Sequence, residues 1–169
     1  GFFFGEHGWF DKRFMYEEAL RIPLIIRYHE VLDPGIAGSM VQNLDLAPTF
    51  LDLAGAPVPA DMQGRSMRQV ASGHPPADWR TAIYYHYYEY PGVHAVRRHY
   101  GIRTDRYKLM HFYGDIDAWE LYDLATDPRE LRNLYADPAY AVLVDTLKLR
   151  LAAMRKECSD TIPPIEGMR

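Results

Sequence analysis

Four runs of strand-forming residues, separated by turn residues, constrain the fold of this chain more than any other feature. The runs are residues 81–90, 96–104, 107–113 and 119–124. They are rich in aromatic and β-branched side chains, which favour extended strands. Residues 104–106 and 115–117 connect successive runs at lengths that suit hairpins. The pattern predicts an antiparallel sheet.

A helix is predicted after the sheet. Asp137-Pro138 is a start signal, and residues 140–154 then carry apolar side chains at helical spacing. These side chains are Val144, Leu147, Leu151 and Met154. Asp127-Pro128 is expected to begin a shorter helical turn. One apolar stripe predicts that the helix packs against the sheet.

The first half of the chain has a different pattern. Residues 22–28 form a short apolar run that predicts a buried strand, and Pro23 fits its first positions. Residues 33–35 form a turn, and residues 43–54 predict a helix closed by Gly55, with Asn43 or Asp45 as its cap. A strand, a loop and a helix in this order indicate an α/β fold.

The boundary between the two patterns lies in residues 56–79, which are rich in Pro, Gly and short polar residues. We therefore expect residues 1–78 to belong to an α/β domain. Residues 79–158 are expected to form a small α+β subdomain, in which the antiparallel sheet packs against the helix. Residues 159–169 are expected to form a tail.

Composition excludes several kinds of protein. The formal net charge is -4, the pI is about 6.0, and no basic face is visible in the pattern, which argues against a nucleic-acid partner. No apolar run approaches the roughly 20 residues that span a bilayer. Cys158 is the single cysteine, so an internal disulfide and a multi-cysteine metal site are excluded. Because the chain begins with Gly1, we expect its natural start to be missing.

A glycine-rich opening carries the polar residues of most chemical interest. Gly1, Gly5 and Gly8 surround Glu6-His7, and Asp11-Lys12-Arg13 follow. Glycines permit unusual backbone conformations, and α/β folds place ligands at such edges. The alternative is a glycine-rich turn with solvated charges, and residue types alone favour that alternative.

Two stretches resemble the type I sulfatase family, which is related to the alkaline phosphatases. The first comprises Gly5-Glu6-His7-Gly8, Lys12, Tyr16-Glu17-Glu18 and Arg21-Ile22-Pro23-Leu24-Ile25. The second comprises His94, residues 97–104, Tyr107-Lys108-Leu109, residues 120–124, Asp127-Pro128, Glu130 and Asn133-Leu134. The resemblance implies the C-terminal part of a sulfatase α/β domain followed by the family's C-terminal subdomain.

The resemblance also implies a mechanism whose central parts lie elsewhere. In this family a cysteine or serine oxidised to formylglycine attacks sulfur, and Ca²⁺ balances the negative charge. The family's metal ligands directly precede the glycine that matches Gly1, so none is expected in this chain. The surroundings of Cys158 lack the proline and arginine of the modification motif. The chain alone is therefore expected to be inactive.

By the same resemblance, Lys12 matches the lysine that contacts the sulfate group. An ammonium can bind sulfate oxygens and stabilise charge on the bridging oxygen as the S–O bond breaks. A solvated surface lysine is the alternative. Asp11 and Arg13 are positioned to bind sugar hydroxyls, or else to pair with each other.

Three histidines have different expected roles. His99 and His94 lie where the subdomain's loop can lean over the active site and bind a sugar hydroxyl, or else they are satisfied within the sheet. His7 is expected to be structural, donating to a backbone carbonyl. The tyrosine-rich residues 84–90 alternate between two faces, so no binding role is assigned to an individual tyrosine.

The overall pattern is most similar to bacterial sulfatases that act on N-acetylglucosamine 6-sulfate and related esters of glycosaminoglycan or mucin. The implied partners are a sulfated carbohydrate and the missing N-terminal part of the same domain. A periplasmic or secreted location is implied by resemblance only. The alternatives are a phosphodiesterase or phosphonate hydrolase of the same superfamily, and a non-catalytic module that binds sulfated glycan.

Overall fold

The computed structural model describes residues 1–30 and 32–161, which form two compact units. The first unit combines Gly1–Pro23 with the chain from Ala82 onward, and the second is Leu24–Thr81. The first 23 residues thus pack with the sheet, whereas the sequence analysis grouped them with residues 24–78. The expected division of the complete protein stays a prediction. None of the described helices has the length and apolar character needed to cross a bilayer.

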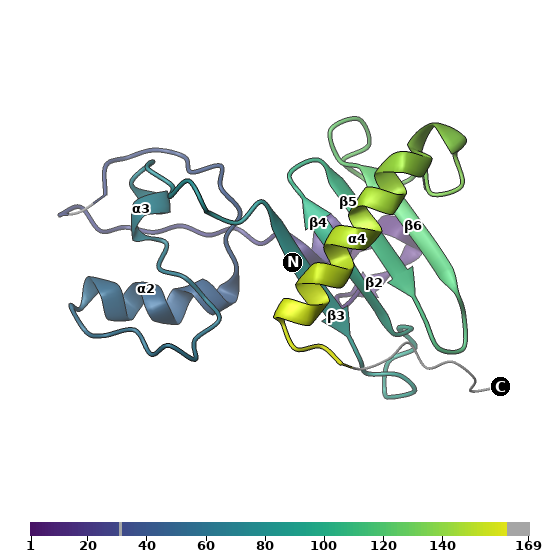
Figure 1. Ribbon diagram of the computed structural model, residues 1–169, viewed down its shortest axis with the longest axis horizontal. Helices are drawn as coiled ribbons and strands as arrows, with labels where there is room; N and C mark the ends of the chain where they lie inside the picture. The colour runs from purple at the N-terminus through teal and green to yellow at the C-terminus, as the bar shows by residue number, and fades with distance from the viewer. Residues whose placement is uncertain (31, 162–169) are drawn as a thin grey trace. The chain divides into compact units, whose positions relative to one another are not determined.

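The first unit is built on a four-stranded antiparallel sheet, visible in Figure 1. Its strands are β3 (Ala82–Tyr87), β4 (His99–Thr104), β5 (Tyr107–Phe112) and β6 (Ala118–Asp123), paired in sequence order. The four predicted strands are confirmed, and Asp105 and Arg106 form the tight loop between β4 and β5.

Helix α4 (Ala141–Glu157) covers one face of this sheet, as Figure 1 shows. A short 3₁₀ turn, η3 (Pro138–Tyr140), leads into it, and the Asp137 carboxylate accepts a hydrogen bond from the backbone N–H of Ala139 at 3.0 Å. The predicted start signal at Asp137-Pro138 is therefore confirmed. At Asp127-Pro128 the chain makes a hydrogen-bonded turn rather than a helix.

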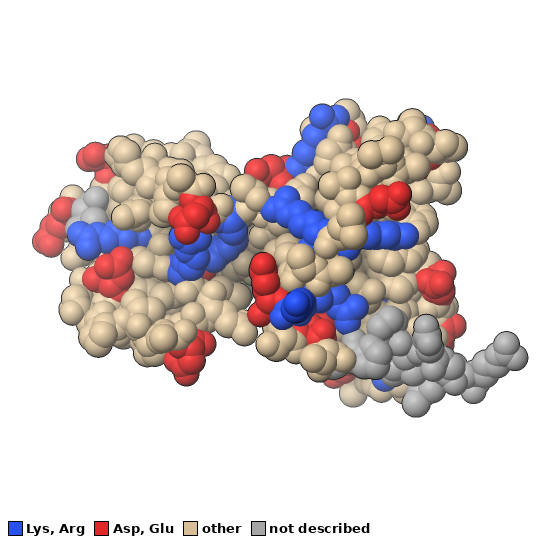
Figure 2. All heavy atoms as spheres, in the orientation of Figure 1, with Lys and Arg blue, Asp and Glu red and all other residues tan. Residues whose placement is uncertain are grey.

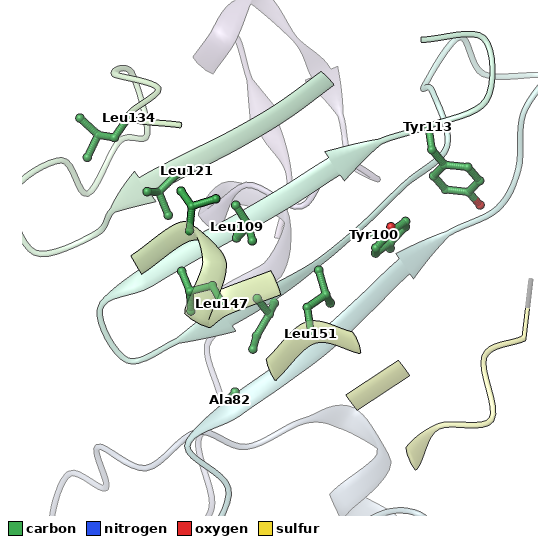
Figure 3. Close-up of a cluster of buried hydrophobic side chains, with 10 residues drawn as sticks. Ala82, Tyr100, Leu109, Tyr113, Leu121, Leu134, Leu147 and Leu151 are labelled. Carbon is green, nitrogen blue, oxygen red and sulfur yellow. The ribbon is translucent and has the colours of Figure 1, made fainter. Parts of the chain in front are cut away.

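The predicted apolar stripe of α4 forms the core on this face (Figure 3). Leu147 and Leu151 pack against strand residues that include Ile102, Leu109 and Leu121. Met154 is partly buried against the same cluster.

The opposite face of the sheet is covered by the start of the chain. This segment contains β1 (Phe3–Phe4), η1 (Glu6–Gly8), β2 (Phe10–Asp11) and α1 (Glu17–Leu20). Its side chains Phe3 and Met15 are fully buried in a cluster with Met110 of β5. At Gly101 of β4, an added Cβ would lie 2.6 Å from the Met15 sulfur, so only glycine allows so close an approach.

The second unit is organised around Asp45, which is fully buried. This unit contains η2 (Asn43–Asp45), α2 (Leu46–Leu53) and α3 (Arg68–Ala71). The Asp45 carboxylate accepts hydrogen bonds from the backbone N–H groups of Gln42 at 2.8 Å and Arg65 at 2.9 Å, and from the Arg80 guanidinium at 2.6 Å. The helix is confirmed, but neither Asn43 nor Asp45 caps α2 with its side chain.

The predicted strand at residues 22–28 is not formed among the described residues. The segment pairs with no other strand, and the Ile25 side chain is 91% exposed. A strand needs a neighbour to satisfy its backbone groups, and no described segment supplies one. Within the second unit, an open cavity of about 790 Å³ is lined by residues 24–29, 32–37 and 39, together with Val41, Met67, Val70 and Ala71.

Candidate functional site

The turn Asp11-Lys12-Arg13 begins at Asp11, the last residue of strand β2. Asp11 has φ 85° and Arg13 has φ 110°, which is the left-handed region that side chains other than glycine rarely adopt. Such conformations persist only where the surrounding structure holds them, and they are common at functional sites. The backbone of the turn is therefore strained, and contacts with the surrounding structure are needed to hold it.

Lys12 lies at the middle of this turn and is exposed. Its ammonium forms no ion pair with any residue that the structure describes. A cation in this position is accessible to an anion from outside these residues.

Asp11 and Arg13 are ion-paired with each other through the carboxylate and the guanidinium. Their side chains keep exposed fractions of 35% and 22%, so both groups retain access to solvent. The local ion pair, which was the alternative prediction for these two residues, is thus present. It leaves other oxygen and nitrogen sites on both groups open for hydrogen bonds.

The turn is tied to the sheet by Tyr85 of β3. The Tyr85 hydroxyl donates a hydrogen bond of 2.6 Å to the backbone carbonyl of Arg13. Burial raises the pKa of Tyr85 to about 12, so the phenol keeps its proton and remains a donor at neutral pH. Sequence analysis did not single out this tyrosine, because alternation identifies its face but not its partner.

His99 is the first residue of β4 and is fully buried. Its Nδ1 lies 2.7 Å from the Arg97 carbonyl oxygen, and its ring stacks near Phe14 and Phe112. Burial lowers the pKa of His99 to about 4, so the ring is neutral at pH 7. A role for His99 in sugar binding stays a prediction.

His94 and His7, the other two histidines considered in the sequence, lie outside the sheet. His94 is half-buried in the loop between β3 and β4, and its proposed contact with a sugar also stays a prediction. The His7 ring stacks on Tyr16 with centroids 4.3 Å apart, and its Nε2 lies 3.6 Å from Glu18 Oε2. The His7 Nε2 therefore lies near a carboxylate without a hydrogen bond, where donation to a backbone carbonyl was expected.

A buried charge cluster that was not predicted from the sequence connects Glu17, the first residue of α1, with Lys108 of β5. Lys108 of β5 has its ammonium 2.9 Å from Glu17 and 2.7 Å from Glu130, and Arg103 also pairs with Glu17. A signal was present, because period-two alternation places Lys108 on the same side of β5 as Met110. A lysine in that register requires a buried anion.

The described residues contain no group of three or more His, Cys, Asp or Glu side chains that fits a metal ion. The described residues alone therefore do not form a metal site of the kind that the sequence resemblance implies. On the described surface shown in Figure 2, basic and acidic side chains are interspersed.

Comparison with known proteins defines the class. The family model described as N-sulphoglucosamine sulphohydrolase, C-terminal, matches residues 5–157. An N-acetylglucosamine-6-O-sulfatase of Bacteroides thetaiotaomicron is 55% identical over 166 residues. A multifunctional alkaline phosphatase superfamily protein, PehA, of Trinickia caryophylli is 30% identical over 158 residues. These matches cover 96% and 83% of this chain but only 30% and 29% of the two relatives.

Solved structures agree with this class. The structure of BT4656 in complex with its substrate D-glucosamine-2-N,6-O-disulfate has a TM-score of 0.88 and 53% identity, and covers 99% of this chain and 34% of that one. A phosphonate monoester hydrolase from Silicibacter pomeroyi has a TM-score of 0.61 and 25% identity, and covers 70% of this chain and 26% of that one. The fold is that of the α/β sulfatase and alkaline phosphatase superfamily. The chain belongs to the sulfatase family and corresponds to its C-terminal domain.

Proposed function

We propose that this chain is the C-terminal part of a sulfuric ester hydrolase that removes sulfate from a sugar of the N-acetylglucosamine 6-sulfate type. The observation that carries this proposal is the 55% identity to an N-acetylglucosamine-6-O-sulfatase over 96% of the chain. The likeness to BT4656 with its bound disulfated glucosamine supports the same substrate class. The likeness to a phosphonate monoester hydrolase is weaker but makes phosphoryl-type esters the second candidate.

Lys12 is the residue of this chain that we assign to the sulfate group. Its ammonium is exposed on a held turn and has no described ion-pair partner. In that position it binds sulfate oxygens and stabilises the charge that develops on the bridging oxygen as the S–O bond breaks.

The neighbouring polar groups are assigned to the sugar. The Asp11 carboxylate accepts hydrogen bonds from hydroxyl groups, and the Arg13 guanidinium donates to hydroxyl oxygens. Each is held in orientation by the other. His94 and His99 complete the proposed set of sugar-binding residues. We rank His99 below Asp11 and Arg13, because its side chain has no exposed surface in this structure.

The remaining chemistry is assigned to residues outside these 169. A formylglycine nucleophile and Ca²⁺ are the groups that the sulfatase family supplies, and the described residues fit neither. Exposed apolar side chains support packing against the rest of the same α/β domain. Phe4 is 75% exposed, Phe10 73% and Ile25 91%. A periplasmic or secreted location belongs to the same proposal.

The test is made on the complete enzyme that contains this chain. Lys12→Ala should lower turnover of N-acetylglucosamine 6-sulfate by at least about a hundredfold without changing the melting temperature. Lys156→Ala removes an exposed lysine at the end of α4 and should leave turnover unchanged. Unchanged turnover in the Lys12 variant would refute the assignment. Preferential hydrolysis of a phosphonate monoester by the unmodified enzyme would favour the second candidate, and sugar binding without any turnover would favour a binding module.

A further inference from the structure

We propose that Tyr85 is a positioning residue that holds the Asp11-Lys12-Arg13 turn in its working conformation. This inference rests on the proposed function of Lys12. The observation that supports it is the 2.6 Å hydrogen bond from the Tyr85 hydroxyl to the Arg13 carbonyl, which joins strand β3 to the end of the turn.

The turn needs such a hold because its backbone is strained. Asp11 and Arg13 both adopt the left-handed region, which disfavours side chains other than glycine. On one side the turn is fixed by β1–β2 pairing, where Phe3 is opposite Asp11. On the other side Met15 is buried against the sheet. The Arg13 carbonyl lies between these two anchors along the chain, and it accepts the hydrogen bond from Tyr85.

Tyr85 is well placed to hold it, since its own position is determined by the sheet. The residue pairs with Gly101 in the β3–β4 ladder, and its ring packs beside His99 with centroids 5.6 Å apart. Its half-buried side chain belongs to the same cluster as Phe3 and Met15. A donor on a strand is held more precisely than a donor on a loop.

The consequence for catalysis follows from geometry. Lys12 directly precedes Arg13, whose carbonyl Tyr85 holds, so a change in the backbone conformation of Arg13 displaces the Lys12 ammonium relative to the sulfate. A displacement of about 1 Å at a positioning group lowers a rate by up to about a hundredfold. Tyr85→Phe removes one oxygen atom and keeps the ring, and we expect it to lower kcat about tenfold in the complete enzyme.

A matched control is available on the same strand. Tyr87 lies on the same face of β3, and its hydroxyl donates to the Glu89 carboxylate at 3.2 Å rather than to the backbone of the turn. Tyr87→Phe removes the same atom and should leave kcat within about twofold of the unmodified enzyme. Both variants should keep the melting temperature close to that of the unmodified enzyme, because each loses one partly buried hydrogen bond.

A double-mutant cycle separates positioning from simple structural damage. If Tyr85 acts through the turn, Tyr85→Phe should lower kcat about tenfold in the unmodified enzyme but by less than about threefold when Lys12 is already alanine. An equal loss in both backgrounds would overturn the inference, as would full activity of Tyr85→Phe. If Lys12→Ala itself has no effect on kcat, the proposed function of Lys12 is refuted. That result differs from the two outcomes that would refute only the role of Tyr85.

Discussion

The Lys108 ammonium lies 2.7 Å from the Glu130 carboxylate, and neither side chain is reached by solvent. Glu17 contributes a second carboxylate at 2.9 Å, and its backbone N–H donates to Glu130 at 2.7 Å. Burial acts to raise the pKa of Glu17, but Lys108 and Arg103 outweigh it and hold this pKa below its ordinary value. Burial raises the pKa of Glu130, and Lys108 offsets that effect only in part. The cluster links α1 to β5.

We expect Lys108→Ala to lower the free energy of unfolding by about 3–5 kcal/mol, because it leaves the Glu130 carboxylate buried without its cation and removes one of the two cations paired with Glu17. Urea unfolding followed by circular dichroism measures the change. Lys156→Ala removes an exposed lysine and should change the free energy by less than about 0.5 kcal/mol. Equal effects of the two substitutions would show that the buried cluster contributes little.

The free energy of unfolding should fall in acid because of His99. Its pKa is lowered by burial to about 4, so the unfolded chain takes up a proton below about pH 6.5 that the folded chain does not. This contribution is fully present above pH 6.5 and is lost as the pH falls towards 4, by up to roughly 3 kcal/mol. Urea unfolding at several pH values should give a shallower acid slope for His99→Asn than for the unmodified chain, while His94→Asn keeps the original slope. The same slope in both variants would exclude His99 as the cause.

The apolar stripe of α4 gives a third prediction. Leu147 is 4% exposed in the core under the helix, whereas Leu149 on the same helix is 75% exposed. Leu147→Ala should therefore lower the free energy of unfolding by about 2–5 kcal/mol, through lost burial and a new cavity. Leu149→Ala has the same helical context and should cost less than about 0.5 kcal/mol. Guanidinium unfolding distinguishes the two, and similar losses would contradict the packing in Figure 3.

The local sequence pattern was sufficient to predict the main elements of the sheet subdomain. The four strands, the tight β4–β5 hairpin and helix α4 follow from alternation, turn residues and an apolar stripe, because neighbours in the sequence are also neighbours in the sheet. The motif around Lys12 was likewise sufficient to indicate the sulfatase family. Both depend on residues close together along the chain.

Other features depended on residues far apart in the sequence, and only the tertiary structure decided them. The sequence pattern of residues 22–28 predicted a buried strand, but these residues pair with no other described segment, because a strand also needs a partner that the pattern does not identify. The docking of Met15 on Gly101 and the bond from Tyr85 to Arg13 join segments more than seventy residues apart. The sequence by itself determined the four strands of the sheet, the helices α2 and α4, and the family to which the chain belongs. The tertiary structure decided which polar atoms meet, because hydrogen bonds and ion pairs require a distance and a direction that spacing along the chain does not contain.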